Sequence, residues 1–340
     1  MKRMLSLLLS ALILVAVGAV YAVVQYKQPS QSAQIQTFEI AKGQGSRQIA
    51  ADLEQKKMIS NQWLFLAALK IKGAEATLKA GEYEIPARAS IKDIQEQLIA
   101  GKVVQRKVTI AEGLTSFEVV HILEQTQGLD GDVTDIPAEG SLLPDTYHFI
   151  LGESRQEKID QMKQALAEIR QQYWDHRDAD LPFSTWEEAV TLASIVEKET
   201  GIVSEQKTIA GVFVNRLKNG IPLQSDPTVI YALTKGRPKN EGQGPLGRRL
   251  LSKDLEIDSP YNTYKNAGLP PTPIANPGKA AILAVLNPEK NDFIYFVADG
   301  SGGHVFAKTL ADHNRNVSEW RKMRHEKNNF DTNNKRKIEK

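Results

Sequence analysis

The sequence predicts an α+β protein with a single N-terminal transmembrane helix, a small α+β module and a larger α+β domain. Three observations predict this architecture: an uncharged apolar run from Met4 to Val24, short strand and helix patterns between Thr37 and Ile110, and longer helical patterns after that point. The chain has 340 residues, 41% of them hydrophobic and 25% charged, which is enough for two compact domains. We place the boundary between module and larger domain near residue 110.

The apolar run matches the length of about 20 residues that a bilayer core requires. Lys2 and Arg3 precede it, so the positive-inside rule predicts a cytoplasmic head over residues 1–3, an anchor over 4–24 and export of the remainder. The alternative is a cleaved signal peptide with Val20-Tyr21-Ala22 before the cut. The run exceeds the roughly 7–15 apolar residues typical of a signal peptide, which favours the anchor.

Residues 25–34 are polar and predict a short tether. The module over 35–110 then begins with a strand at 37–40 and helices at 46–56 and 61–72. A second round follows, with a strand at 81–85, a helix capped by Ser90 that reaches Ala100, and a strand at 105–110. These strand and helix units resemble LysM-like modules, and a plain spacer domain is the alternative.

The larger domain, over 111–325, is expected to begin with a helix from Ser116 to Gln125. A long amphipathic helix should follow from Glu153 to about His176. Ser184 and Glu187 form a capping-box pattern for a further helix, which ends before Gly201. The charged tail over 326–340 is expected to be frayed.

Composition excludes several kinds of chemistry. The chain has no cysteine, which rules out disulfides, a thiolate nucleophile and cysteine-ligated metals. The six histidines are scattered, so no metal or other cofactor is expected. The Gly300–Gly303 cluster lacks the Lys-Ser/Thr of a phosphate loop. Lys and Arg number 43 against 41 Asp and Glu, so no global positive charge would attract nucleic acid.

Glu199 is the candidate for acid catalysis. At about 100° per residue it falls on the apolar stripe of its helix with Leu192 and Val196, whereas Glu197 and Lys198 fall on the side expected to face solvent. A carboxyl held against apolar side chains has a raised pKa, as a proton donor near neutral pH needs. The alternative is a structural ion pair at the end of the helix.

The residues around Glu199 resemble a known family. The run Ala193-Ser194-Ile195-Val196-Glu197-Lys198-Glu199-Thr200 is similar to the signature of the endolytic murein transglycosylase, or YceG-like, family. The same order of motifs continues in stretches that span most of the chain: Leu143–Tyr147, Val214–Leu217, Leu223–Tyr231, Ser259–Tyr264, Gly268–Pro271, Ile274–Gly278, Tyr295–Gly300 and Gly303–Phe306.

The resemblance implies a lyase: a peptidoglycan lytic transglycosylase that cleaves the bond between MurNAc and GlcNAc in nascent glycan strands. It would leave 1,6-anhydro-MurNAc ends and act as a terminase of strand elongation. Glu199 maps onto the family's catalytic residue and would serve as both acid and base, while Thr200 would orient the carboxyl or the substrate. The expected location is the inner membrane, single-pass, with the catalytic domain in the periplasm next to peptidoglycan synthases.

Further residues are candidates for substrate contact, because amide, phenol and imidazole groups suit N-acetyl and hydroxyl groups of sugars. They are Asn215, Gln224, Asp226, Tyr261, Asn262, Tyr264 and His304. For Asp226, the alternative to substrate contact is a role in forming the turn before Pro227. For His304, the alternative is a role in stabilising its loop.

Two rival functions remain open at this stage. A non-catalytic peptidoglycan-binding scaffold would also suit the anchor and the module. A peptidoglycan hydrolase would need a second carboxylate, for which Asp226 and Asp145 are the candidates, at about 5 Å or about 6.5–9.5 Å from Glu199.

Overall fold

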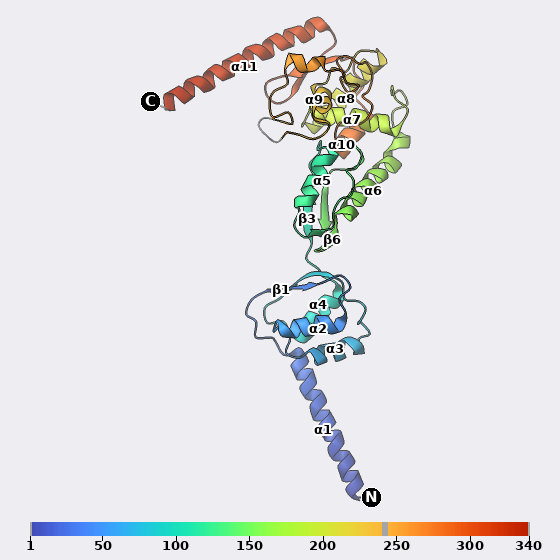
Figure 1. The fold of residues 1–340 in the computed structure, drawn as a ribbon, viewed down its shortest axis with the longest axis vertical. Coiled ribbons are helices and arrows are strands. Elements are labelled where there is room, and N and C mark those ends of the chain that lie inside the picture. Colours follow the sequence, from blue (N-terminus) through green and yellow to red (C-terminus); the bar gives the residue numbers. More distant parts are fainter. Residues whose placement is uncertain (1, 240–243, 339–340) are drawn as a thin grey trace. The chain divides into compact units, whose positions relative to one another are not determined.

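The structure, a computed structural model, describes residues 2–239 and 244–338. Met1 of the expected head and residues 339–340 of the expected tail lie outside the described residues. Contacts divide the chain into two compact units (Figure 1). The first contains the residues up to Lys107 together with 127–130 and 148–154, and the second contains the rest. Whether 35–110 and 111–325 are folding domains stays a prediction.

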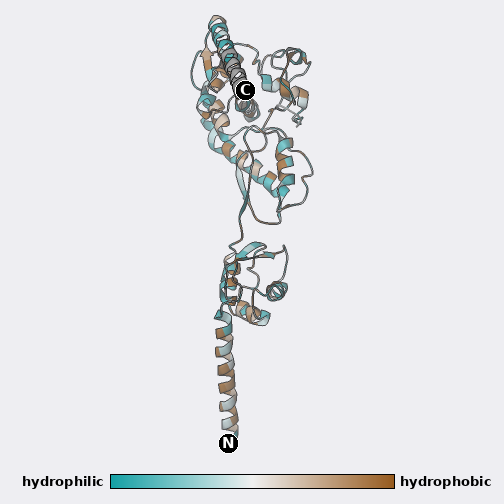
Figure 2. Ribbon diagram, turned by 90° about the vertical axis from the view of Figure 1, so that its left-hand side faces the viewer, coloured by the Kyte–Doolittle hydropathy of each residue, from teal (hydrophilic) through white to brown (hydrophobic). Residues whose placement is uncertain are grey.

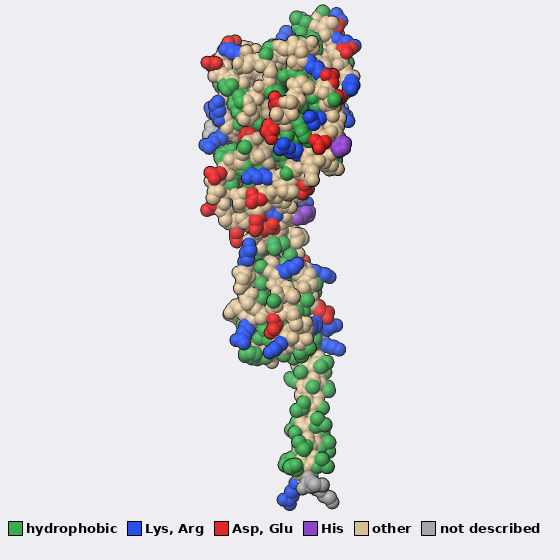
Figure 3. Space-filling view, turned by 90° about the vertical axis from the view of Figure 1, so that its right-hand side faces the viewer, with side chains coloured by type: hydrophobic (Ala, Val, Ile, Leu, Met, Phe, Trp, Pro, Cys, Tyr) green, Lys and Arg blue, Asp and Glu red, His purple; other side chains and the backbone are tan. Residues whose placement is uncertain are grey.

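The chain begins with the apolar helix α1 (Lys2–Lys27). Residues Arg3–Lys27 form a helix long and apolar enough to cross a membrane. Figure 2 colours most of this helix as hydrophobic or intermediate, and Figure 3 shows hydrophobic side chains along the face that it draws. The helix ends at Lys27 and therefore includes the first three residues of the segment expected to be a tether.

The first unit packs helices against a two-stranded antiparallel sheet. Strand β1 (Gln36–Ile40) pairs with β2 (Gly81–Ile85), and Phe38 lies opposite Tyr83. The helices are α2 (Ser46–Gln55), α3 (Gln62–Ile71) and α4 (Ile91–Ala100). Because alternate strand residues face the same side, Phe38, Ile40, Tyr83 and Ile85 all reach the core. The mixed helix and sheet prediction is confirmed, and the LysM-like character stays a prediction.

Small sheets and a capped helix precede the helical core of the second unit. Strand β3 (Arg106–Thr109) pairs with β5 (Thr146–Phe149), whereas the parallel pair of β4 (Leu129–Asp130) and β6 (Glu153–Ser154) belongs to the first unit. Helix α5 (Ser116–Gln125) starts with a capping box between Thr115 and Glu118. These short elements match the expected helix at 116–125 and the expected strand at 105–110.

The core of the second unit is helical. Leu192, Ile195 and Val196 of α7 (Trp186–Glu199) pack against Ile209 and Phe213 of α8 (Val203–Lys218). The other elements of this unit are α6 (Arg155–Tyr173), η1 (Trp174–His176), α9 (Asp226–Thr234), η2 (Ser252–Glu256), α10 (Lys279–Leu286), the hairpin strands β7 (Tyr295–Ala298) and β8 (His304–Ala307), and α11 (Leu310–Ile338).

Two sequence predictions are corrected here. The cap of α7 is Thr185 with Glu188, one residue later than the expected Ser184 and Glu187, because Thr185 is the residue with extended backbone angles. The tail expected to be frayed is helical up to Ile338. No proline or glycine occurs after Leu310 to end that helix.

Candidate active site

Glu199 is the last residue of α7. The preceding turns are anchored in the core, since Leu192, Ile195 and Val196 are fully buried. Glu199 itself is half-buried as a residue, next to the fully buried Val196 and the buried Thr200. A carboxylate at a helix C-terminus also faces the negative end of the helix dipole, which disfavours ionisation.

The carboxyl of Glu199 accepts a hydrogen bond from the side chain of Ser225. The distance from Ser225 Oγ to Glu199 Oε1 is 2.5 Å. Ser225 is held in place by its own backbone N–H, which donates to Thr263 Oγ1 at 3.0 Å, and Thr263 in turn lies 2.9 Å from Thr228 Oγ1. The preceding residue, Gln224, has a φ of 53°, a left-handed conformation that costs a non-glycine residue energy. The strained residue Gln224 thus directly precedes Ser225, whose side chain contacts Glu199.

Burial raises the pKa of Glu199 to about 7. The hydrogen bond from Ser225 opposes this shift, the negative charge of Asp226 adds to it, and the charges of His304 and Arg216 oppose it. A carboxyl with this pKa is protonated in a large fraction of molecules near neutral pH. It can therefore give a proton and take one back at the same pH.

Arg216 holds the loop that carries Ser225. Its Nη1 donates to the carbonyls of Pro222 at 3.1 Å and Leu223 at 2.9 Å, and its Nε donates to Ile294 O at 2.7 Å. The side chain is buried, and burial lowers its pKa. This guanidinium thus joins the loop before α9 to the strand region at β7, next to Glu199.

Asp226 and Tyr264 form a second polar pair beside Glu199. Tyr264 Oη donates to Asp226 Oδ1 at 2.6 Å. Burial and this bond raise the pKa of Tyr264, which keeps its hydroxyl protonated. Asp226 is the carboxylate whose charge acts on Glu199, whereas Asp145, the other candidate for a second carboxylate, accepts from the backbone N–H of Thr146.

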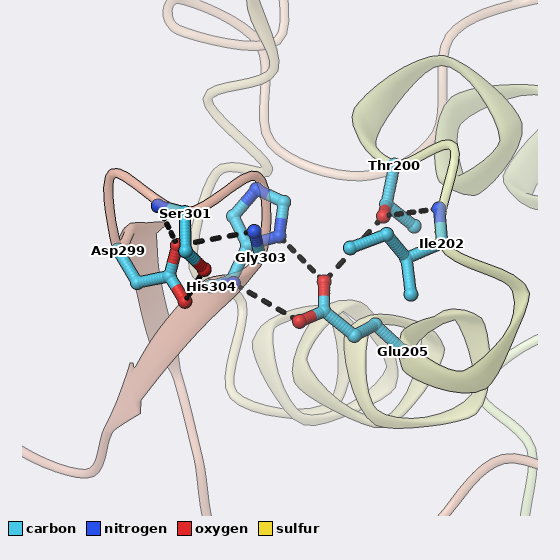
Figure 4. Close-up of polar contacts among 7 residues, drawn as sticks. All are labelled: Thr200, Ile202, Glu205, Asp299, Ser301, Gly303 and His304. Atoms are coloured by element: carbon cyan, nitrogen blue, oxygen red, sulfur yellow. Dashed lines mark hydrogen bonds and ion pairs between the residues drawn. The ribbon is translucent and has the colours of Figure 1, made fainter.

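His304 is held in place by Glu205. Glu205 Oε1 accepts from the backbone N–H of His304 at 3.0 Å, and Oε2 lies 2.8 Å from His304 Nδ1 (Figure 4). Burial would raise the pKa of Glu205, but the bonds from His304 hold it below its usual value. A Cβ at Gly303 would lie 2.8 Å from Glu205 Oε1, so a larger residue there would displace the Glu205 carboxylate.

The turn before His304 is closed by a separate carboxylate. Asp299 Oδ1 accepts from the backbone N–H groups of Ser301 at 2.7 Å and Gly303 at 3.1 Å (Figure 4). This turn joins β7 and β8, which pair antiparallel as a hairpin. Both roles weighed for His304 stay open, because its imidazole lies near Glu199 and also stabilises the loop.

The other candidate residues have different surroundings. Thr200 is buried, and its hydroxyl accepts from Ile202 N at 3.0 Å and lies 3.5 Å from Glu205 Oε2. Gln224 is exposed, with its amide oxygen 3.4 Å from Arg216 Nη1, a position open to substrate. Tyr261 Oη lies 2.7 Å from Thr272 Oγ1.

Two asparagines are used for structure. Asn262 is fully buried, and its amide donates to the carbonyls of Leu255 and Ile257. Asn215 donates to the carbonyls of Asn291 and Phe293, at 2.8 and 2.9 Å. Their hydrogen-bonding groups organise loops, so neither side chain is presented to a sugar in this conformation.

The prediction that Glu197 faces solvent is wrong. Glu197 is half-buried, and its Oε2 accepts from the backbone N–H of Gly278, the N-cap residue of α10, at 3.0 Å. Burial raises its pKa, and the nearby Glu112 acts in the same direction. Lys198 is exposed as expected, and its Nζ donates to Gly113 O. The helical wheel omitted α10, which packs along α7.

The sequence reasoning missed three residues of the site: Ser225, Arg216 and Glu205. Ser225 and Arg216 lie inside motif runs already singled out, between or beside chosen residues, and could have been selected as donors to a carboxylate. Glu205 gives no local signal, because its partner His304 is 99 positions away. Within the part of the chain that the structure describes, no group of three or more His, Asp or Glu side chains could hold a metal ion.

Comparison with known proteins gives consistent results. The YceG-like family matches residues 38–319. An endolytic murein transglycosylase of Bacillus subtilis is 31% identical over 323 residues, covering 85% of this chain and 86% of the relative. One of Streptococcus pneumoniae is also 31% identical, over 83% of this chain and 58% of the relative. A crystal structure of a YceG-like protein from Listeria monocytogenes matches with a TM-score of 0.50 and 33% identity, covering 84% of this chain and 99% of that one. The chain therefore belongs to the YceG-like family.

Proposed function

We propose that this chain is a membrane-anchored endolytic lytic transglycosylase of peptidoglycan, a lyase, with Glu199 as its acid and base. The observation that carries the proposal is the Glu199 carboxyl, whose burial raises its pKa to about 7 and which accepts a hydrogen bond from Ser225. Family membership supports the reaction class, since curated relatives are named endolytic murein transglycosylases.

The first step is proton donation. Protonated Glu199 gives its proton to the oxygen that links MurNAc C1 to GlcNAc C4, and the C1–O bond breaks as positive charge develops at C1. The charge of Asp226 favours the protonated form of Glu199 that starts this step. The N-acetyl carbonyl of the same sugar stabilises the developing cation.

The second step closes the anhydro ring. The C6 hydroxyl of MurNAc attacks C1 while ionised Glu199 takes its proton, so a C1–O6 bond replaces the bond that broke and Glu199 returns to its starting form. No water is consumed. Attack within one sugar benefits from a high effective molarity, so one carboxyl is sufficient where hydrolysis needs two.

The surrounding residues have positioning roles in this proposal. Ser225 orients the carboxyl of Glu199 through its 2.5 Å bond. Gln224 and Tyr264 offer amide and phenol groups to sugar hydroxyls and N-acetyl groups. His304, whose imidazole Nδ1 is paired with Glu205, is near enough to act electrostatically on Glu199.

Product analysis tests the chemistry. Muropeptides released by the purified protein should carry 1,6-anhydro-MurNAc ends by mass spectrometry. Reducing ends would instead assign hydrolysis, which the closeness of Asp226 to Glu199 makes the relevant second candidate. A pure binding scaffold would release neither product.

Anchoring places the reaction near the membrane. With α1 as a single inner-membrane span and the remaining chain in the periplasm, the enzyme would meet nascent strands beside the synthases and terminate their elongation. Full-length protein should remain with membranes after carbonate washing, and a mature N-terminus at Val23 would show cleavage instead. Deleting residues 1–25 while retaining export should change the length of glycan chains in cells.

A further inference from the structure

Helix α3 exposes large apolar side chains on one face. Trp63 is 70% exposed and Ile71 is 86% exposed, although Phe65 and Leu69 of the same helix are fully buried. At about 100° per residue, Trp63 and Ile71 lie within about 80° of each other, and the buried pair lies on the opposite side. Ala67 and Lys70 lie with the exposed pair, and both are exposed. We call Trp63, Ala67, Lys70 and Ile71 the outer face of α3.

Exposed tryptophan and isoleucine on one short helix are unusual for a surface in water. Trp is enriched where a membrane meets water, because its ring is apolar and its N–H is polar. Lys70 on the outer face and Lys72 next to Ile71 add positive charge, which attracts anionic lipid headgroups. The composition of this face therefore suits the headgroup layer of a bilayer.

The end of α1 is fastened to α3 through a buried glutamine. Tyr26, in the last turn of α1, donates to Gln95 Oε1 at 2.6 Å, and Gln95 Nε2 donates to Phe65 O of α3 at 3.1 Å. Gln95 is fully buried, and Tyr26 packs against the core of the first unit. This connection fixes α3 beside the end of α1 within one compact unit.

The chain after α1 reinforces this attachment. Pro29 forms a bridge with Ser90, and the backbone N–H of Ser30 donates to Ala89 O at 3.2 Å. Figure 1 draws α3 at the end of this unit from which α1 leaves, and β1 at the opposite end. Figure 3 shows apolar and basic side chains at the base of the unit next to α1. The outer face of α3 points away from the core at this end.

We propose that the outer face of α3 rests in the headgroup layer of the bilayer that α1 spans. The inference depends on the membrane span in the proposed function, and adds a second membrane contact that sets the tilt and height of the first unit. Helices of this kind bury their apolar face about 5–10 Å into the boundary between headgroups and acyl chains. The contact would hold this unit against the membrane rather than let it swing freely.

The absence of cysteine allows a clean test by single-site labelling. Full-length protein in lipid nanodiscs that contain phosphatidylglycerol would carry an environment-sensitive fluorophore at one of three positions: Ile71→Cys on the outer face, Glu39→Cys on β1, or Val15→Cys in α1. Quenching would be measured with nitroxide placed on lipid headgroups and, separately, deep in the acyl chains.

The proposal expects three distinct results. The Ile71 label should show blue-shifted emission and roughly twofold or stronger quenching by headgroup nitroxide compared with the Glu39 label, as an interfacial position requires. The Val15 label should be quenched by the deep nitroxide. An Ile71 label as exposed to water as the Glu39 label, with Val15 in lipid, would overturn the inference and leave the outer face to a protein partner. A Val15 label in water would instead refute the anchor itself.

A second set of variants tests the named side chains. A label at Ala67→Cys should lose most of its headgroup quenching when Trp63 and Ile71 are both changed to serine, because these side chains supply the apolar contact. Both are exposed, so the substitutions leave the core intact, which thermal unfolding would verify. Unchanged quenching in the double variant would contradict the role assigned to the two residues.

Discussion

The two sides of the last turn of α7 carry carboxylates with similar burial and different partners. Glu199 and Glu197 are both half-buried, and burial raises the pKa of each. Glu197 accepts from a backbone N–H at the start of α10, whereas Glu199 accepts from the Ser225 hydroxyl on a strained loop. The difference teaches that a raised pKa alone does not identify a catalytic acid. The partners give a second criterion, because the role proposed for Glu199 rests on its hydroxyl donor as well as on its raised pKa.

The largest expected effect separates the two carboxylates directly. Glu199→Gln should lower the release of anhydro products by at least about 10²–10⁴-fold, the usual contribution of general acid–base catalysis. Glu197→Gln should retain most activity, since the glutamine oxygen still accepts from Gly278 N. Muropeptide mass spectrometry would compare the two, with thermal unfolding as the check on folding. Selective loss in Glu197→Gln would show that the wrong carboxylate has been assigned.

Removing the donor to Glu199 should have the next largest effect. Ser225→Ala should lower activity by about tenfold, because a hydrogen bond to a charged group contributes about 1.5–3 kcal/mol. The bond lowers the pKa of Glu199, so its loss should raise that pKa and move the alkaline limb of the pH–rate profile upwards. Ser318→Ala is the matched control, because Ser318 is exposed on α11 and its Oγ donates to Asn314 O within the same helix. An unchanged alkaline limb in the Ser225→Ala variant would show that Ser225 does not influence the titration of Glu199.

The pair of Glu205 and His304 should contribute less than Ser225. Glu205→Gln weakens the acceptor for His304 Nδ1, and we expect activity to fall by about three- to tenfold through misplacement of the imidazole. His304→Gln should cause a similar loss, and the double variant should lose little more than either single one. Glu187→Gln, on an exposed side chain of α7, serves as the control. Fully additive losses would mean that the two residues act separately.

Neutralising Asp226 should move the pH profile in the direction opposite to Ser225→Ala. The negative charge of Asp226 raises the pKa of Glu199, so Asp226→Asn should lower that pKa and shift the alkaline limb to lower pH by roughly half a unit. Rates measured between pH 5 and 9 would show the shift. Equal shifts in the same direction for both variants would contradict the electrostatic account of the site.

Stability should show the smallest effect, and its sign follows from the same pKa. The pKa of Glu199 is about 7 in the folded protein and about 4.5 in an ordinary environment, so ionisation destabilises the fold. This cost is absent below about pH 4.5, grows up to about pH 7 and is constant above it. Glu199→Gln should therefore stabilise the protein at pH 8 by about 1–2 kcal/mol, and by less at pH 5. Glu197→Ala should cost about 1 kcal/mol through loss of its hydrogen bond with the backbone N–H of Gly278. Denaturant unfolding at both pH values would measure these differences.

The sequence by itself determined the local features of this protein. The long apolar run became α1, the Ser90 cap became the capping box of α4, and alternation at 81–85 became β2. The placement of Glu199 on the buried side of its helix also followed from periodicity. These features depend on residues only a few positions apart, so the local sequence pattern is sufficient to predict them.

Only the tertiary structure decided which groups surround the two carboxylates. Gly278 lies 81 positions after Glu197, Ser225 lies 26 after Glu199, and His304 lies 99 after Glu205. These contacts arise because α9 and α10 pack against α7 and the β7–β8 hairpin packs against α8. The order of residues along one helix contains no information on which elements will cover it. A helical wheel can show that a side chain leaves the core stripe. Whether that side chain then meets solvent or a distant backbone N–H depends on the packing of the other helices, as Glu197 shows.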